Sequence, residues 1–371
     1  MKIAILGTRG IPNNHGGFEQ FAEHFSLYMA QKGHDVSVFN SHTHPYQLNK
    51  WKGVKIIHKN DPEDKIGTIG QFIYDLNCIN HCRKEQFDII LQLGYTSNSI
   101  WHKRLPKKSI IITNMDGLEW KRSKYNKLVR QFLKTAESLA VKSSDYLISD
   151  SIGIQKYLND TYKKDSYYIP YGATPFDSPD DQFLEDYGVK PLKYSLLIAR
   201  LEPENNIESI LDGIVLSKTK EKFLVIGKHD VNKFGSYLKN KYKNFRHIEF
   251  IGGIYNLDQL NNLRYFSKFY FHGHSVGGTN PSLLEAMASG TLIVANDNIF
   301  NRSILKKNAL YFKNAKDIAV IFQNNSLFEN NKVLFSKNNI KEIKLNFRWE
   351  SINHKYEQYL ISKMHKDKCQ K

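Results

Sequence analysis

Short apolar runs alternate with longer segments of helical period along the chain. Apolar runs bounded by glycine or polar turns predict buried strands, and segments with apolar residues three and four apart predict helices between them. This alternation is typical of a parallel sheet covered by helices. In the first half we expect strands at residues 2–6, 36–40, 54–58, 88–93, 109–113 and 146–149, and helices at 17–32, 69–84 and 123–143.

The same pattern restarts after a break near residue 172. Proline and glycine interrupt the backbone at residues 169–173, and an acidic stretch with proline follows at 178–186, which predicts a linker between two domains. After it we expect strands at residues 194–199, 223–226, 247–251, 269–272 and 292–295, with helices at 206–217, 257–267 and 281–289.

These elements predict an α/β protein with two doubly wound, Rossmann-like parallel sheets. Such sheets carry their ligand-binding loops at the carboxyl ends of the strands, so we expect the two domains to face one another across a cleft. The expected domains are residues 1–172, residues 173–346 and a C-terminal helix at 347–371. A length of 371 residues agrees with two domains, because single cores stop growing near ~250–300 residues.

Composition excludes several other classes of protein. With 41% hydrophobic and 13% aromatic residues the chain can bury a core, which argues against disorder. Three cysteines, Cys78, Cys82 and Cys369, are too few for a disulfide framework or a four-cysteine zinc site. They favour a reducing, cytoplasmic location, and we expect Cys78 and Cys82 to pack inside a helix. No apolar run reaches the ~18–20 residues of a transmembrane helix.

Half of the net charge of +16 lies in residues 101–142, where eleven basic residues face three acids. Part of this stretch predicts a basic amphipathic helix whose other face carries Leu128 and Phe132. A solvated outer helix is the alternative reading. Because tryptophans and a tyrosine lie nearby and basic residues favour anionic lipid, we hypothesise that this face docks on an anionic inner-membrane surface. The docking residues are Lys103, Arg104, Lys107, Lys108, Lys124, Lys127 and Lys134.

A glycine-rich loop follows the first expected strand at residues 7–19, GTRGIPNNHGGFE. Gly16 and Gly17 open the next helix, so their amides can approach an anion at the positive end of that helix. A simple turn is the alternative. The loop lacks the G-x-G-x-x-G fingerprint and the P-loop lysine, which weakens an alternative reading as a nicotinamide-dependent oxidoreductase.

A second such loop lies at residues 272–290, HGHSVGGTNPSLLEAMASG. Asn280 is the expected N-cap, with Pro281 at the first helical position, and Gly277 and Gly278 leave the preceding amides open. Glu285 then lies a little over one turn into the helix, where its carboxylate can hydrogen-bond a vicinal diol such as a ribose. A merely structural Glu285 is the alternative.

An arginine ends the first expected strand of the second half, in residues 197–206, LIARLEPENN. The guanidinium of Arg200 suits a diphosphate, since its fork binds two oxygens and can stabilise charge on a leaving group. A solvated surface arginine is an equally good reading of this residue alone.

Together these three segments resemble the bacterial family-4 glycosyltransferases, retaining enzymes of the GT-B fold. The resemblance covers nearly the whole chain, including YIPYG at residues 168–172 and FRWE at 347–350. It implies two facing domains and a C-terminal helix that crosses back onto the first domain. More narrowly, residues 7–12, 114–122 and 277–281 look like the rhamnosyltransferase branch that builds capsule and O-antigen repeats.

Two positions depart from the family pattern. Asn205 stands where a lysine is expected after the arginine, and Gly277 stands where the first of two glutamates is expected, leaving only Glu285. The lost lysine removes a charge from the phosphate site, and the missing glutamate often contacts the donor sugar. Both departures fit a donor sugar other than the common glucose type.

The resemblance implies transfer of a sugar from a nucleotide-sugar donor to a hydroxyl, with retention and without a metal or other cofactor. No Asp-x-Asp cluster follows a strand to suit a magnesium–diphosphate bridge. Arg200 would stabilise the leaving diphosphate and Glu285 would hold the ribose; with Asp116 they form the expected catalytic set. The expected donor-binding residues are Gly16, Gly17, Arg200, Asn205, Gly277, Gly278, Thr279, Asn280 and Glu285.

The expected acceptor is a polyprenyl-diphosphate-linked saccharide, and the expected donor is dTDP-L-rhamnose. Acceptor binding is assigned to Arg9, His15, Asp116 and Glu119 in the first domain. Asp116 would orient the acceptor hydroxyl or take its proton, although a capping role is nearly as good a reading. The expected location is the cytoplasm, peripheral on the inner face of the plasma membrane. Alternatives are another donor sugar, a sugar-nucleotide epimerase of the same fold, or a nucleic-acid-binding protein, for which no recognised module is present.

Overall fold

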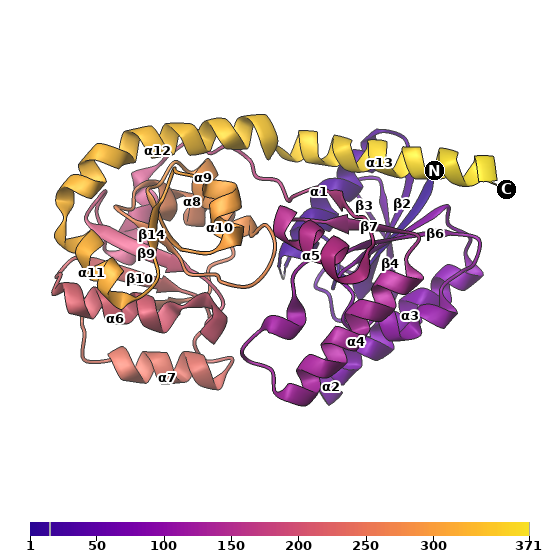
Figure 1. Ribbon diagram of the computed structural model, residues 1–371, viewed down its shortest axis with the longest axis horizontal. Helices are drawn as coiled ribbons and strands as arrows, with labels where there is room; N and C mark the ends of the chain where they lie inside the picture. The colour runs from indigo at the N-terminus through magenta and orange to yellow at the C-terminus, as the bar shows by residue number, and fades with distance from the viewer. Residues whose placement is uncertain (15, 371) are drawn as a thin grey trace. The chain divides into compact units, whose positions relative to one another are not determined.

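The computed structural model describes residues 1–14 and 16–370, which form two compact units, each built on its own sheet (Figure 1). The first unit contains Met1–Lys121, Tyr125–Tyr171 and the C-terminal stretch from Trp349. The second contains Gly172–Arg348 and the short segment Arg122–Lys124. The units therefore differ from the expected domains mainly in this segment, which belongs with the second unit although it lies within the first half of the sequence.

The first unit has a sheet in the order β3-β4-β2-β1-β5-β6-β7-β8, parallel throughout except for the antiparallel edge pair β3 and β4. The strand order reverses between β1 and β5, as in a doubly wound fold. The strands are β1 (Lys2–Leu6), β2 (Asp35–Ser41), β3 (Lys50–Trp51), β4 (Val54–Lys59), β5 (Ile89–Leu93), β6 (Ile110–Asn114), β7 (Tyr146–Ser149) and β8 (Tyr167–Tyr168).

Helices connect the strands of this sheet and pack against it to form the core. One hydrophobic cluster joins Leu6 and Phe39 from the strands to Cys78 and Cys82 from a helix, and both cysteines are buried free thiols, as predicted. The helices are α1 (Gly17–Gln31), α2 (Glu63–Ile66), α3 (Ile69–Lys84), α4 (Lys127–Ser143), α5 (Ile152–Tyr162) and α13 (Trp349–Gln370), with the 3-10 turns η1 (Ser99–Arg104) and η2 (Glu119–Lys121).

The second unit has a wholly parallel sheet in the order β11-β10-β9-β12-β13-β14. Here the order reverses between β9 and β12. The strands are β9 (Tyr194–Ile198), β10 (Lys222–Ile226), β11 (Ile248–Gly252), β12 (Tyr270–His272), β13 (Ile293–Asn296) and β14 (Leu310–Phe312). The helices are α6 (Ile207–Ser217), α7 (Lys233–Tyr242), α8 (Leu257–Tyr265), α9 (Pro281–Ala288), α10 (Ile299–Leu305), α11 (Ala315–Gln323) and α12 (Asn325–Asn346), with η3 (Asp181–Tyr187) and η4 (Pro203–Asn205).

The α/β class and both parallel sheets are confirmed, and every predicted strand is present within one or two residues. The prediction missed the short edge strands β3, β8 and β14, since two or three residues leave little periodicity to detect. It also started the helix at residues 123–143 too early. That helix begins at Lys127, because the side chain of Asn126 caps it by accepting a hydrogen bond from the Val129 amide at 2.9 Å.

The C-terminal helix α13 packs on α1 within the first unit (Figure 1). The buried ring of Tyr356 lies 4.6 Å from the ring of Phe21 and 5.3 Å from that of Phe25. At the start of the helix, Trp349 stacks on His24 with ring centroids 4.4 Å apart. The last helix of the sequence therefore completes the core of the first unit.

Replacing Tyr356 with alanine should destabilise the protein by about 3–5 kcal/mol, because it leaves a cavity between α13 and α1. Urea unfolding followed by far-UV circular dichroism measures this loss. The neighbouring Lys355 is exposed, so Lys355→Ala is the matched control and should change stability by less than about 0.5 kcal/mol. Equal stability of the two variants would contradict the packing described.

Candidate functional site

The strongest candidate site of the second unit lies where the strand order reverses, between β9 and β12. In open α/β sheets, ligands bind outside the carboxyl ends of the strands at this point. Arg200 follows β9, and the glycine-rich loop at residues 273–280 follows β12. Since β9 and β12 are hydrogen-bonded neighbours, both predicted donor-binding segments start from the same edge of one sheet.

The backbone oxygen of Arg200 closes the turn that carries this residue. The Arg200 carbonyl accepts hydrogen bonds from the Glu202 amide at 2.8 Å and from Asn205 Nδ2 at 2.7 Å. Asn205 is buried, so its side chain supports the turn while the side chain of Arg200 is exposed. The sequence predicts that both residues bind the donor; in the structure the Asn205 side-chain amide hydrogen-bonds within the turn.

The glycine-rich loop is pressed against this turn. A Cβ atom at Gly273 would lie 2.0 Å from the Asn205 carbonyl oxygen, so no larger residue fits there without displacing backbone. The Asn206 side chain donates to the Gly273 carbonyl at 2.8 Å, and Ser275 donates to the Glu204 carbonyl through its amide and its hydroxyl. The two loops therefore form one rigid assembly.

Helix α9 begins as predicted at the end of this loop. The Asn280 side chain accepts from the Ser282 amide at 2.9 Å, and Pro281 occupies the first helical turn. Gly277 has φ of 132°, a conformation that other residues rarely adopt. Thr279 is buried beside it. The positive end of α9 thus follows directly on a loop with glycine-dependent geometry.

Glu285 on α9 forms an ion pair that the sequence did not reveal. Its Oε2 lies 2.6 Å from Nη2 of Arg264, whose side chain is only 1% exposed. The same guanidinium donates to the Ser282 hydroxyl at 3.2 Å and to Asn261 Oδ1 at 3.0 Å. Arg264 lies on α8, and nothing in its spacing distinguishes it from a surface arginine. A buried pair of this kind orients the Glu285 carboxylate and makes removal of its charge costly.

Two histidines stand at the start of the loop, the buried His272 and the partly buried His274. The rings of His272 and His274 stack with centroids 4.4 Å apart. Both ring nitrogens of His272, and Nδ1 of His274, lack a hydrogen-bond partner within the described part of the chain. Burial lowers the pKa of His274 to about 3, helped by the charges of Arg200 and Arg122. Buried polar atoms are normally satisfied, so these nitrogens mark a place where a polar ligand would be stabilised.

In the first unit, Gly16 and Gly17 lie at the start of α1, where they were expected. The preceding loop is fixed by Asn40, which accepts from the Ile11 amide at 3.0 Å and donates to its carbonyl at 2.8 Å. The Arg9 amide donates to the buried carboxylate of Glu19 at 2.8 Å. His15, an expected acceptor-binding residue, lies outside the described residues.

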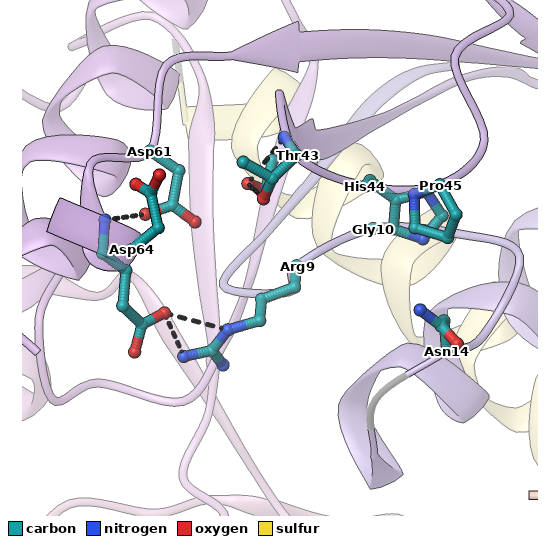
Figure 2. A pocket seen from close by; sticks show the side chains of 10 residues that line it. Arg9, Gly10, Asn14, Thr43, His44, Pro45, Asp61 and Asp64 are labelled. Carbon is teal, nitrogen blue, oxygen red and sulfur yellow. Dashed lines mark hydrogen bonds and ion pairs between the residues drawn. The ribbon is translucent and has the colours of Figure 1, made fainter. Parts of the chain in front are cut away.

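An open pocket of about 280 Å³ lies beside this loop (Figure 2). Arg9 reaches across it to the Glu63 carboxylate, which accepts from Nε at 3.1 Å and from Nη2 at 2.5 Å. His44 is held on the other side, where its Nδ1 accepts from the Tyr46 amide, so its Nε2 donates to the Pro12 carbonyl. The lining residues are Arg9, Gly10, Asn14, Ser41, Thr43, His44, Pro45, Asp61, Glu63 and Asp64.

Apart from Arg9, none of these lining residues had been predicted as a site residue. They follow β1, β2 and β4, neighbouring strands whose carboxyl ends meet at one edge of the sheet. The sequence carries only a weak signal for this pocket, because its polar residues follow three strands that lie far apart in the chain. A chain of net charge +16 thus has, in this pocket, three carboxylates and one guanidinium, which suits a neutral polyhydroxyl ligand better than an anion.

The loop with Asp116 and Glu119 is held by a buried carboxylate, Glu137 on α4. Glu137 accepts from Tyr157 at 2.7 Å, Tyr162 at 2.8 Å, Tyr95 at 3.2 Å and Trp120 Nε1 at 3.2 Å. The Tyr95 hydroxyl also contacts the loop backbone at Gly117 and Glu119. Asp116 itself accepts from the Tyr171 hydroxyl at 3.1 Å. The sequence pattern does not predict this role for Glu137, because it is one acid in a basic helix.

The predicted basic surface lies on η1, on the turn that follows it and on α4, and η1 packs on α4. Lys103, Arg104, Lys107, Lys108, Lys127 and Lys134 are exposed, whereas Lys124 pairs with Glu202 in the second unit at 3.3 Å. The apolar side of α4 differs from the prediction: its buried residues are Leu133, Ala136, Glu137, Ala140 and Val141. Leu128 is 83% exposed and Phe132 is exposed as well.

No helix among the described residues is long and apolar enough to cross a membrane. They also contain no group of three or more histidine, cysteine, aspartate or glutamate side chains placed to hold a metal ion.

Comparison with known protein families finds one match in each half of the chain. Residues 1–174 match a domain of unknown function (DUF1972), and residues 183–347 match the family described as glycosyl transferases group 1. The chain carries a group 1 glycosyltransferase domain and has the GT-B fold. No curated protein sequence matches this glycosyltransferase.

Solved structures resemble it over almost their whole length. Sucrose-phosphate synthase from Thermosynechococcus elongatus has a TM-score of 0.80 at 15% identity, with 97% of this chain and 98% of that chain covered. Anabaena HepE in complex with UDP has a TM-score of 0.73 at 15% identity, covering 98% and 100%. WaaG, a glycosyltransferase involved in lipopolysaccharide biosynthesis, has 0.74 at 13% identity, covering 97% and 99%. At these identities the likeness shows the fold.

A buried acid near the pocket of this glycosyltransferase makes its stability depend on pH. Burial raises the pKa of Asp75 to about 7, against the effect of a 2.5 Å hydrogen bond from Ser97. The folded state then keeps this proton to higher pH than the unfolded state, so stability falls as pH rises from about 4 to 7.

Asp75→Asn should therefore stabilise the protein at pH 8 by roughly 2–4 kcal/mol and have little effect at pH 4.5. Thermal unfolding across this pH range measures the difference. Asp64 is exposed, so Asp64→Asn is the control and should track the wild type throughout. A constant difference between Asp75→Asn and wild type at all pH values would show that Asp75 does not titrate as described.

Proposed function

We propose that the enzyme transfers L-rhamnose from dTDP-L-rhamnose to a hydroxyl of a polyprenyl-diphosphate-linked saccharide, with retention of anomeric configuration, in surface polysaccharide synthesis. The choice of rhamnose rests on the resemblance of residues 7–12, 114–122 and 277–281 to that branch. A nucleotide-sugar donor is supported by HepE, a neighbour in fold described in complex with UDP and with UDP-glucose.

One observation carries the proposal: the Arg200 turn and the loop before α9 meet at the strand-order reversal of the second sheet. This place combines an exposed guanidinium, the positive end of a helix and buried histidine nitrogens without partners in the described residues. These groups suit the diphosphate of a donor. Glu285, oriented by Arg264, is proposed to hold the ribose.

In the proposed reaction, the bond between the anomeric carbon and the β-phosphate oxygen breaks, and a bond from that carbon to the acceptor oxygen forms. The nucleoside diphosphate leaves with the electron pair, and Arg200 stabilises the developing negative charge. The proton of the acceptor hydroxyl passes to Asp116 or to the leaving diphosphate. The pocket with Arg9 is proposed to bind hydroxyl groups of the acceptor saccharide.

A ligand that binds only the folded state raises the melting temperature, so a nucleotide screen tests the donor. We expect thymidine diphosphate to stabilise the wild type more than uridine or guanosine diphosphate does. Arg200→Ala should lower sugar transfer by at least about 100-fold, with an unchanged melting temperature without ligand, because the side chain is exposed. Glu285→Gln is preferred to alanine, since the glutamine amide oxygen can still accept the hydrogen bond from Arg264, whereas alanine leaves the buried guanidinium without any acceptor at this position.

The product separates the alternatives. A new sugar on the acceptor supports transfer, whereas an altered free nucleotide sugar would indicate an epimerase. Stronger stabilisation by uridine or guanosine diphosphate would contradict dTDP-L-rhamnose as the donor. It would not contradict the transferase reaction. Full activity of Arg200→Ala would overturn the site.

The enzyme is further proposed to work at the inner face of the plasma membrane, docked through α3, η1 and α4 of its first unit. Exposed Leu128 and Phe132 lie among the basic residues of α4, and the Phe132 ring packs on Phe72 of α3 with centroids 5.7 Å apart. Ile69 and Ile73, on either side of Phe72, are exposed too. Apolar side chains within a basic surface suit an anionic bilayer, at ~1 kcal/mol per basic residue near the surface.

The double variant Leu128→Ser, Phe132→Ser should bind anionic liposomes at least about ten-fold more weakly than wild type, because it removes the inserting side chains. Liposome sedimentation with anionic and neutral lipids measures this. Val333 on α12 is 77% exposed in the second unit, so Val333→Ser is the control and should bind like wild type. Equal binding of wild type to both lipids, or none, would refute membrane docking.

A further inference from the structure

The pocket of the first unit contains a buried carboxylate with one oxygen available to a ligand. Asp61, which follows β4, is only 5% exposed. Its Oδ1 accepts a hydrogen bond from the Glu63 amide at 3.1 Å, whereas its Oδ2 has no hydrogen-bond partner among the described residues. The side chain lines the pocket, and in Figure 2 the second oxygen points toward the space between the lining residues. Because buried polar side chains are normally hydrogen-bonded, Asp61 Oδ2 marks a position for a donor group of a ligand.

The positive charge of this pocket is already paired. Glu63 Oε2 accepts from Arg9 Nε at 3.1 Å and from Arg9 Nη2 at 2.5 Å, and Glu63 Oε1 accepts from Gln71 Nε2 at 2.6 Å. Arg9 and Glu63 therefore neutralise one another. The carboxylates of Asp61 and Asp64 remain, and neither forms an ion pair with another described residue. A ligand in the pocket thus meets two negative charges that no lining cation balances.

The opposite wall of the pocket carries no charge. Burial lowers the pKa of His44, so its ring is neutral near pH 7. The ring accepts from the Tyr46 amide at 3.1 Å and donates to the Pro12 carbonyl at 3.1 Å. The hydroxyls of Ser41 and Thr43 share one hydrogen bond of 2.9 Å. Since that bond uses one of their two hydroxyl hydrogens, the other is available to donate to a ligand.

We propose that Asp61 anchors the terminal sugar residue of the acceptor by accepting hydrogen bonds from its hydroxyl groups, and that the pocket selects an uncharged sugar residue and rejects a sugar acid. This rests on the proposed function, because it names the class of acceptor sugar in that reaction. It also adds Asp61 to the acceptor-binding residues as the one that determines specificity for charge.

The selectivity follows from the donors and acceptors that each kind of sugar brings. A sugar hydroxyl both donates and accepts, so a neutral sugar can hydrogen-bond Asp61 and the available hydroxyl hydrogen of the Ser41 and Thr43 pair together. An ionised carboxylate only accepts. A sugar acid therefore places a third negative charge beside Asp61 and Asp64, and like charges brought together in a binding site act against the wrong ligand.

The test uses pairs of methyl glycosides that differ only at C6, the glucoside with the glucuronide and the galactoside with the galacturonide. Titrations followed by saturation-transfer difference NMR give the dissociation constant of each. We expect wild type to bind a neutral glycoside at least about 10-fold more tightly than its uronide. Asp61→Asn keeps an acceptor for the Glu63 amide but removes the charge, so it should weaken binding of the neutral glycoside and reduce the ratio to about 3-fold or less.

Two further variants make this result specific. Asp160 is exposed on α5 of the same unit, so Asp160→Asn is the matched control: it removes an equal charge outside the pocket and should keep the wild-type ratio. Asp64 is also exposed, so Asp64→Asn leaves the fold intact. It should lower the ratio by about 3-fold, which tests the charge selectivity even where Asp61→Asn proves unstable.

Equal or tighter binding of the uronides by wild type overturns the proposal, and so does failure of both neutral glycosides to bind. An unchanged ratio in a folded Asp61→Asn, or a change of the same size in Asp160→Asn, overturns the role of Asp61. All of these outcomes concern the sugar pocket alone. Absence of any transfer product, with a wild type that binds the neutral glycosides selectively, would instead contradict the proposed function.

Discussion

The close approach of Gly273 to the Asn205 carbonyl oxygen fixes the geometry of the second unit's site. It joins the turn after β9 to the loop after β12, and it is possible only because residue 273 has no side chain. From this contact follow the position of His274, the pairing of Ser275 with Glu204, and the direction in which the loop reaches the start of α9. A rigid joint between two loops is what a site needs in order to hold charges in place before the ligand arrives.

Buried charged side chains fix two other parts of the proposed site. Glu137 gathers four aromatic donors and thereby sets the loop that carries Asp116, while the pair of Arg264 and Glu285 sets the carboxylate on α9. Each arrangement requires burying an ion, which is unfavourable unless hydrogen bonds compensate for the lost water. Both arrangements lie beside the proposed binding loops. We infer that their main contribution is to hold those loops in position.

The two halves of the chain divide the proposed chemistry between them. The second unit carries cations, a helix start and buried imidazoles, groups that suit a diphosphate. The first unit carries a pocket rich in carboxylates, which suits hydroxyl groups, and a basic surface with exposed apolar side chains. The excess of positive charge therefore concerns two different anions in the proposed function, the donor and the lipid surface.

Periodicity alone determined the class of fold, nearly every strand, and the capped start of α9, because buried strands and helix caps are local signals. Arg200, Glu285 and the two glycine loops were also visible, since each directly follows a strand or opens a helix. Arg264, Glu137, Asp75 and the pocket residues were not, because a charge acquires its role from burial and partners brought from distant segments. The segment Arg122–Lys124 shows this most clearly. Its sequence predicts the start of a surface helix, and only the tertiary structure places it on the Glu202–Glu204 turn, where its charges pair with the buried Glu204 and the partly exposed Glu202.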